Sequence, residues 1–134
     1  MHITMLEPRE MVGEYYKALY GGELKKVQAI STKVSFVMTL ESFGLRLSLR
    51  DDSFKHALSK IDEDPYALVE VIHKLSKEMK SRAKEPLIEI VSVHHNGSER
   101  QTVRFKEDGK MKMLHFSRVG KQWKLDYYAG RSVA

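Results

Sequence analysis

Apolar residues near the start of the chain recur every three or four positions, which is the spacing of one face of an α-helix. A first helix is predicted to begin at Pro8, because the N–H group that proline lacks would be unbonded in a first helical turn anyway. The helix is predicted to end at Gly21–Gly22, since glycine adopts the left-handed conformation of a helix C-terminus without steric cost. Leu24, Val27 and Ile30 predict a short second helix.

The next stretch fits two patterns. Apolar side chains alternate over 34–40 and again over 45–49, which predicts two short strands joined by a turn at 41–44. A single helix is the alternative, because a helical face is also shared by Val34, Val37 and Met38.

Helical spacing returns further along the chain. A helix is predicted over 53–61, with Ser53 as its N-terminal cap. A long helix is predicted from Asp64–Pro65, where a capping residue precedes proline, to about Arg82. Glu85–Pro86 ends it, because a residue before proline avoids helical geometry.

From Leu87 onward apolar and polar residues alternate, which is the pattern of a half-buried strand. The predicted strands cover 87–95, 98–107, 110–119 and 121–128. The turns between them are Asn96–Gly97, Asp108–Gly109 and Gly120–Lys121, and Asn-Gly and Asp-Gly are strong hairpin signals. Residues 1–134 are therefore expected to form one α+β domain, with the helices packed on one face of a bent antiparallel sheet.

Two-residue turns would fix which residues lie opposite each other in the sheet. The predicted pairs are Ile88–Phe105, Ile90–Val103, Ser92–Gln101, Val103–Leu114, Gln101–Phe116, Phe116–Leu125, Leu114–Tyr127 and Arg118–Trp123. Residues directly opposite share a face, so this register gathers the large apolar side chains on one face. The first helix and the long helix are predicted to cover it.

Toward one end the same face becomes polar, and a candidate ligand site is predicted there. An apolar concavity with a few convergent polar groups is typical of a small-molecule site. The candidate ligand-binding residues are Tyr15, Ser92, His94, Gln101 and Arg118. The alternative is that these residues form a solvated rim at the strand ends.

The opposite sheet face is too apolar to be fully hydrated and too polar to be a core. It carries Val91, Val93, Met113 and Tyr128, together with the cross-strand pairs Glu89–Arg104 and His115–Asp126. A homodimer through this outer face is predicted. An ordinary exposed face is the alternative.

Composition narrows the classes of function. The chain has 134 residues, a net charge of +5 and no cysteine, which excludes disulfides, thiolate metal sites and a cysteine nucleophile. No apolar run is long enough for a transmembrane segment, and no signal peptide is recognised, so a cytoplasmic location is the default expectation. No metal or cofactor is predicted: His94 and His95 are adjacent on a strand and point to opposite faces.

Positive charge is concentrated in the second half of the chain. The clearest cluster is Lys74, Lys77, Lys80, Arg82 and Lys84. It fits either an anion-binding patch or a solvated helix end whose cations complement the helix dipole. Binding of nucleic acid is not favoured, because no aromatic residue is interleaved with these cations.

Two segments resemble a known superfamily. Residues 15–24 (YYKALYGGEL) resemble the opening segment of the nuclear transport factor 2-like proteins. Residues 118–125 (RVGKQWKL) resemble the last hairpin of the same proteins. That superfamily includes ketosteroid isomerases, SnoaL-like cyclases and uncharacterised bacterial modules, and the chain is most similar to the last group. The resemblance implies a cone-shaped fold, a pocket between helices and sheet, and dimers formed through the sheet.

The resemblance also suggests where catalytic groups would lie. Tyr15 matches the tyrosine that donates to the oxyanion in ketosteroid isomerases, but the matching base position falls near Thr39, with Glu41 the nearest carboxylate. His115 and Asp126 could imitate the SnoaL-like pair, but on the outer face. No catalytic residue is therefore assigned.

The predicted function is a noncatalytic module that binds a small apolar or amphipathic ligand, or a protein partner. A small isomerase-like or cyclase-like enzyme using the same pocket is one alternative. A basic module that binds an anionic polymer or surface is the other.

Overall fold

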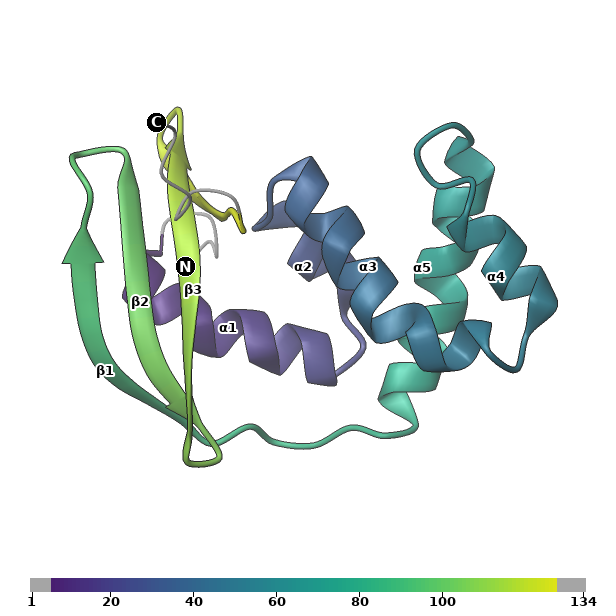
Figure 1. Ribbon diagram of the computed structural model, residues 1–134, viewed down its shortest axis with the longest axis horizontal. Coiled ribbons are helices and arrows are strands. Elements are labelled where there is room, and N and C mark those ends of the chain that lie inside the picture. Colours follow the sequence, from purple (N-terminus) through teal and green to yellow (C-terminus); the bar gives the residue numbers. More distant parts are fainter. Residues whose placement is uncertain (1–5, 128–134) are drawn as a thin grey trace.

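The computed structural model describes residues 6–127, which form five helices followed by a four-stranded antiparallel sheet (Figure 1). The helices are α1 (Pro8–Tyr20), α2 (Leu24–Ala29), α3 (Lys33–Ser48), α4 (Asp52–Leu58) and α5 (Pro65–Lys80). The strands are β1 (Ile88–His95), β2 (Arg100–Glu107), β3 (Lys110–Val119) and β4 (Gln122–Leu125). The predicted α+β class is confirmed.

Most helix boundaries follow the local signals in the sequence. Pro8 opens α1, and Gly22, with φ of +73°, follows its end. Asp64 caps α5 by accepting a hydrogen bond from the backbone N–H of Tyr66. The cap of α4 is Asp51 rather than the predicted Ser53, because the Asp51 carboxylate accepts from the Phe54 N–H at 3.0 Å.

The two strands predicted over 34–40 and 45–49 are wrong, since the single helix α3 occupies this stretch. The buried face of α3 includes Ser35 and Thr39. A search for the spacing of apolar residues misses this face, because these two residues are polar. The Thr39 hydroxyl donates to the carbonyl of Ser35 one turn earlier, so its burial leaves no unbonded polar group. Thr32 caps the helix by accepting a hydrogen bond from the Ser35 N–H.

The second and third hairpins have the predicted register. Val103 lies opposite Leu114, Gln101 opposite Phe116, and Phe116 opposite Leu125. The turn between β2 and β3 is Asp108–Gly109, with φ of 51° and 82°, as a two-residue turn requires. The last ladder ends at Leu125, so the predicted pair Leu114–Tyr127 is not part of it.

The first hairpin differs from the prediction. Asn96–Gly97 does not form a two-residue turn: the Asn96 N–H donates to the Arg100 carbonyl and the loop takes four residues, 96–99. A β-bulge then shifts the register between Ile90 and Ser92.

The bulge changes which β1 side chains face the helices. Ile90 lies opposite Phe105 and stays on the inner face, but Ser92 lies opposite Arg104 and His94 opposite Thr102. The predicted pairs Ile88–Phe105, Ile90–Val103, Ser92–Gln101 and Glu89–Arg104 are therefore wrong. Val93 lies opposite Val103 and packs against the core.

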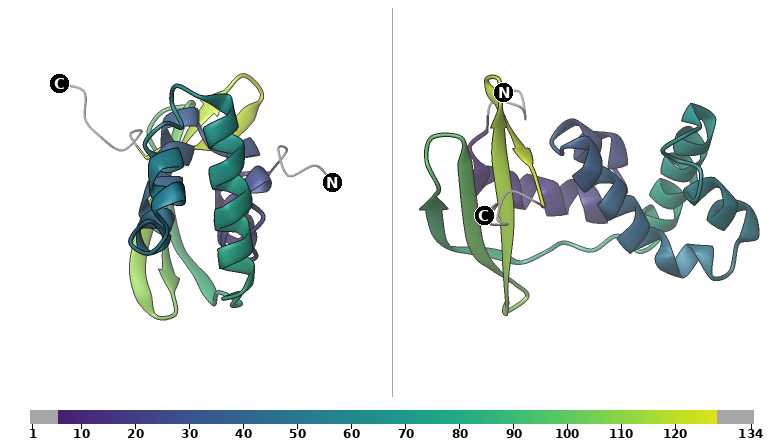
Figure 2. Two further views of the ribbon diagram at one scale, coloured as in Figure 1. Left: turned by 90° about the vertical axis from the view of Figure 1, so that its right-hand side faces the viewer. Right: turned by 45° about the horizontal axis from the view of Figure 1, so that its top comes forward.

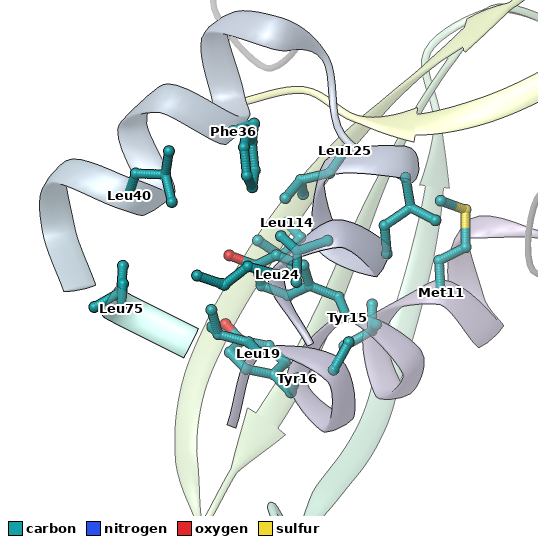
Figure 3. Packing of buried hydrophobic residues seen from close by; sticks show 14 of the residues in the cluster. Met11, Tyr15, Tyr16, Leu19, Leu24, Phe36, Leu40, Leu75, Leu114 and Leu125 are labelled. Carbon is teal, nitrogen blue, oxygen red and sulfur yellow. The ribbon is translucent and has the colours of Figure 1, made fainter. Parts of the chain in front are cut away.

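The core lies between α1 and the inner sheet face and continues into the helices (Figure 3). Tyr16 of α1 contacts Phe105 of β2, with ring centroids 5.6 Å apart. The junction of α2 and α3 holds the end of β4, because Leu125 donates to the Ile30 carbonyl and accepts from the Thr32 N–H.

The long helix does not cover the sheet as predicted. It packs against α3 and α4, and Figures 1 and 2 show α4 and α5 at the end of the molecule away from the strands. The helix that packs on β1 and β2 is α1. Within residues 6–127, none of the helices has both the length and the apolar composition needed to span a bilayer.

The surface predicted to form a homodimer is divided by the bulge. Val93 faces the core, Met113 is exposed on the outer face, and Tyr128 lies outside the described residues. Dimer formation itself stays a prediction.

Candidate ligand-binding groove

The structure does not gather the predicted ligand-binding residues at one opening. Tyr15 and Gln101 are buried. Ser92 and His94 lie opposite residues of the outer sheet face and are exposed. Arg118 is exposed over the ring of Trp123, 6.0 Å from its centroid. Tyr15 thus lies in the core on α1, and the four strand residues are divided between the two faces of the sheet.

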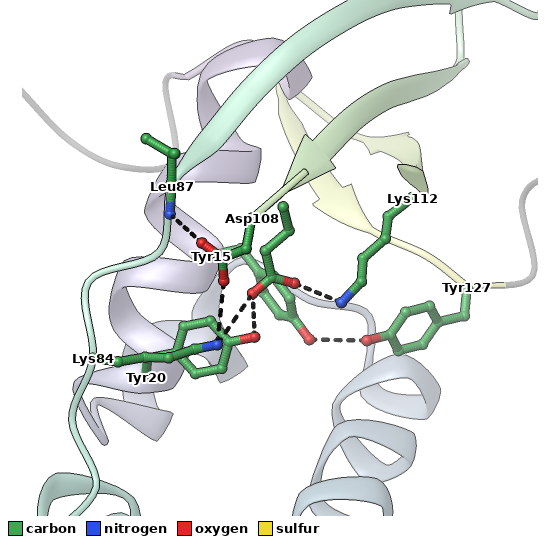
Figure 4. A network of polar contacts seen from close by, with 8 residues as sticks. Tyr15, Tyr20, Lys84, Leu87, Asp108, Lys112 and Tyr127 are labelled. Atoms are coloured by element: carbon green, nitrogen blue, oxygen red, sulfur yellow. Dashed lines mark hydrogen bonds and ion pairs between the residues drawn. The ribbon is translucent and has the colours of Figure 1, made fainter. Parts of the chain in front are cut away.

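Tyr15 belongs to a hydroxyl cluster in the core. Its hydroxyl lies 2.8 Å from that of Tyr127 (Figure 4). It also lies 3.3 Å from the hydroxyl of Thr39, which in turn bonds the Tyr127 hydroxyl. Burial, with a further contribution from Tyr127, raises the pKa of Tyr15 far above its usual value, so the hydroxyl stays neutral. The cluster joins α1, α3 and the segment after β4.

Replacing Tyr15 with phenylalanine should therefore affect stability. Deleting the hydroxyl should lower the free energy of unfolding by about 1 kcal/mol, the usual net value of a hydrogen bond, because Thr39 and Tyr127 still bond each other. Urea denaturation measures the change. Unchanged stability together with a changed affinity for a ligand would instead place Tyr15 in a binding site.

A second polar cluster is built around Glu107, the last residue of β2. Its side chain is 3% exposed, and its carboxylate accepts hydrogen bonds from Tyr20 and from Lys112 (Figure 4). Burial alone would raise the pKa of Glu107, but these bonds and the nearby ammonium groups outweigh it and hold the pKa below its usual value. Burial and the bond to Glu107 raise the pKa of Tyr20. The cluster is thus an anionic carboxylate with neutral and cationic donors.

The same cluster fixes the segment that connects α5 to β1. Lys84 of this segment lies 3.5 Å from the Asp108 carboxylate and over the ring of Tyr20, 4.6 Å from its centroid. The Asp108 N–H donates to the Leu87 carbonyl at 3.0 Å, and the Asp108 carboxylate accepts from the Leu87 N–H at 3.3 Å. The position of Lys84 is therefore set from two sides, and Lys84 lines the groove described next.

A groove of about 590 Å³ lies between the C-terminal half of α3, the end of α5 and the connecting segment. Its apolar wall comes from Phe43, Leu45, Leu47 and Met79, with Tyr20 at one side. Gly44 lets α3 approach α4 closely, because the Phe54 ring would lie 3.0 Å from a Cβ atom added at Gly44. The groove is thus an open apolar trough along the last turns of α3.

Cations outnumber anions along this groove. Its charged residues are Arg46, Arg82, Lys84 and Glu78. Glu78 binds Arg82 at 3.2 Å and also Arg50, and the hydrogen bond from Arg50 together with the cationic charges lowers the pKa of Glu78. Arg46 takes part in none of the ion pairs found among residues 6–127. Its charge contributes to the lowered pKa of Glu78, but among residues 6–127 no carboxylate lies within ion-pair distance of it, so it is the groove cation most available to an added anion.

No protein-family model, curated protein or solved structure matches the chain. The similarity to the nuclear transport factor 2-like proteins stays a prediction.

Sequence reasoning found part of this groove. Arg82 and Lys84 belong to the basic cluster seen in the sequence, whereas Phe43 and Arg46 fell in the stretch predicted as a turn and a strand. The helical alternative for that stretch is the signal that could have located them. Among the described residues, no three His, Asp or Glu side chains converge where a metal ion could bind.

Proposed function

We propose that the protein is a noncatalytic binding module whose groove holds a small amphipathic molecule with an anionic end. The observation that carries the proposal is the meeting of an apolar wall with three cations and one carboxylate in a single groove. The ligand class matches the amphipathic ligand predicted from the sequence, but the binding site is on α3 and α5 rather than at the end of the sheet.

The dimensions of the groove favour a small molecule. Ligand sites have volumes of about 300–1,000 Å³ and are mostly apolar, with a few polar groups that orient the ligand. The groove falls within this range. An aliphatic or aromatic body lying along Phe43, Leu45 and Met79 would remove apolar surface from water, which contributes roughly 25 cal/mol for each Å² buried.

Arg46 is proposed to hold the anionic end. A guanidinium group offers donors that match a carboxylate or phosphate in a two-pronged contact. Arg82 and Lys84 add positive potential, although their own carboxylate partners reduce it. A hydrogen bond to a charged group contributes about 1.5–3 kcal/mol net, so the loss of Arg46 should weaken binding about tenfold or more.

The polar clusters support binding rather than catalysis. A ketosteroid isomerase needs a tyrosine hydroxyl that can donate to the substrate, together with a carboxyl group whose pKa is raised. Here the Tyr15 hydroxyl is engaged in the core, Glu41 is exposed on α3, and the pKa of the buried Glu107 is lowered.

Arg46→Ala tests the proposal directly. A dansyl-labelled undecanoic acid reports binding by its fluorescence, and its methyl ester is the uncharged counterpart. The variant should bind the acid about tenfold more weakly than the wild type and the ester equally well, because only the acid loses a charge partner. Arg104→Ala, on the exposed outer face of the sheet, is the matched control and should bind the acid like the wild type.

Two results would reject the groove as the binding site. One is an Arg46→Ala variant that keeps full affinity for the acid. The other is a loss of affinity for the acid in Arg118→Ala but not in Arg46→Ala. That result would place the binding site at the end of the sheet, as predicted from the sequence.

A further inference from the structure

Beside the groove, large apolar side chains are exposed at the C-terminal end of α3. Leu45 is 62% exposed and Leu49, the residue that caps the helix, is 81% exposed. The Leu49 N–H donates to the Leu45 carbonyl, so the two leucines are one helical turn apart and share a face of α3. Side chains of this kind at such exposure, next to one another and next to an apolar groove, mark an interaction surface.

Cations surround the same leucines. Arg46 and Arg50 flank them in the sequence, and Arg82 and Lys84 line the groove together with Leu45. Arg50 and Arg82 meet at the carboxylate of Glu78, which holds the end of α5 beside the end of α3. About half of the side-chain surface of Arg50, Arg82 and Lys84 remains exposed.

We propose that this surface, formed by Leu45, Arg46, Leu49, Arg50, Arg82 and Lys84, docks onto an anionic lipid bilayer. The two leucines would enter the boundary between headgroups and acyl chains while the cations contact anionic headgroups. Because the bilayer would supply the amphipathic ligand to the groove, the inference rests on the proposed function.

The composition of the surface favours a bilayer over a single-stranded nucleic acid. Both leucines are aliphatic and largely exposed; Leu45 stands at the edge of the groove, and Leu49 lies outside it. A single-stranded nucleic acid needs aromatic side chains on which its bases stack, and none of the six residues of this surface is aromatic; Phe43 and Tyr20 lie in the groove beside it. A bilayer needs only apolar groups that reach beyond the headgroups and cations beside them.

Leu49→Glu tests the docking without changing the groove, which Leu49 does not line. Val34→Glu is the matched control, since Val34 is 53% exposed at the opposite end of the same helix. Flotation is measured with vesicles of phosphatidylcholine alone and with vesicles containing phosphatidylglycerol. The wild type and Val34→Glu should bind the anionic vesicles, less so at high salt, and Leu49→Glu should bind them at least tenfold more weakly. Circular dichroism checks that each variant is folded.

Three outcomes would overturn the inference: no binding of the wild type to anionic vesicles at low salt, equal binding by Leu49→Glu, or an equal loss in Val34→Glu. The affinity of the same variants for the dansyl-labelled acid is measured in solution without vesicles. This measurement tests the proposed function separately from the docking. Leu49→Glu that binds the acid normally but not the vesicles supports both ideas. The wild type could also bind vesicles but not the acid. The surface would then still dock onto a bilayer, but the bilayer would not supply a ligand to the groove, which contradicts the inference as stated.

Discussion

Replacing Gly22 with alanine is expected to lower the free energy of unfolding by about 3 kcal/mol. Gly22 has φ of +73°, a left-handed conformation that costs a residue with a side chain roughly 1–2 kcal/mol. An added Cβ atom would also lie 2.5 Å from the Ser76 carbonyl oxygen and 2.6 Å from Cγ of Lys80. The turn after α1 and the helix α5 would have to separate, and overpacking of this kind typically costs a further 1–3 kcal/mol.

Gly97→Ala is the matched control for this prediction. Gly97 has φ of +78°, but no other atom lies within 4 Å of its added Cβ position. Gly97→Ala should lower the free energy of unfolding only by the backbone strain. Urea denaturation of both variants therefore separates the effect of backbone strain from the effect of the close contact with α5. Equal losses in the two variants would show that α5 does not pack tightly against the turn at Gly22.

The second large effect is expected at the buried carboxylate of Glu107. Glu107→Gln keeps the shape of the side chain but removes its charge, so Lys112 and Lys84 lose their shared anion and Tyr20 its charged acceptor. Breaking a buried ion pair costs about 3–5 kcal/mol. The partners here are half exposed and can recover some hydration, so a loss of about 2–3 kcal/mol is expected.

The pH dependence of this loss gives a second check. The pKa of Glu107 is lowered in the folded protein, so its carboxylate stabilises the fold at pH values above the unfolded pKa. That contribution disappears as the pH falls through the folded pKa. The stability difference between wild type and Glu107→Gln should therefore be constant near neutral pH and shrink in acid.

Glu78→Gln is the control for the carboxylate prediction. Glu78 also pairs with two cations and also has a lowered pKa, but its side chain is 22% exposed and its partners Arg50 and Arg82 are half exposed. Its substitution should cost less than that of Glu107, because exposed ion pairs contribute little. A larger loss at Glu78 than at Glu107 would mean that burial does not determine the strength of these pairs.

The parts of the fold that the sequence predicts are those that local signals determine. Asp108–Gly109 sets the second hairpin because both residues adopt positive φ, and Asp64–Pro65 starts α5 because it combines a cap with proline. Asn96–Gly97 carries an equally strong signal, yet the loop there is longer than two residues, and β1 has a bulge at Ile90–Ser92. The register there depends on burying Val93 against the core, which only the tertiary structure specifies.

The groove was harder to predict, because its residues meet only through packing. Arg46 and Lys84 are far apart in the sequence, and each reaches the groove through a contact that no local pattern encodes. Arg46 depends on α3 being a helix, which in turn depends on burial of the polar residues Ser35 and Thr39. Lys84 depends on the contacts of the connecting segment with Tyr20 and Asp108.

The most direct test of the binding groove is a two-dimensional NMR titration of the wild-type protein with dodecanoate. Saturable changes in amide chemical shift are expected around Phe43 and Arg46 on α3, Met79 at the end of α5, and Lys84 on the connecting segment. Changes concentrated around Ser92, His94 and Arg118, or no saturable change at all, would contradict the account.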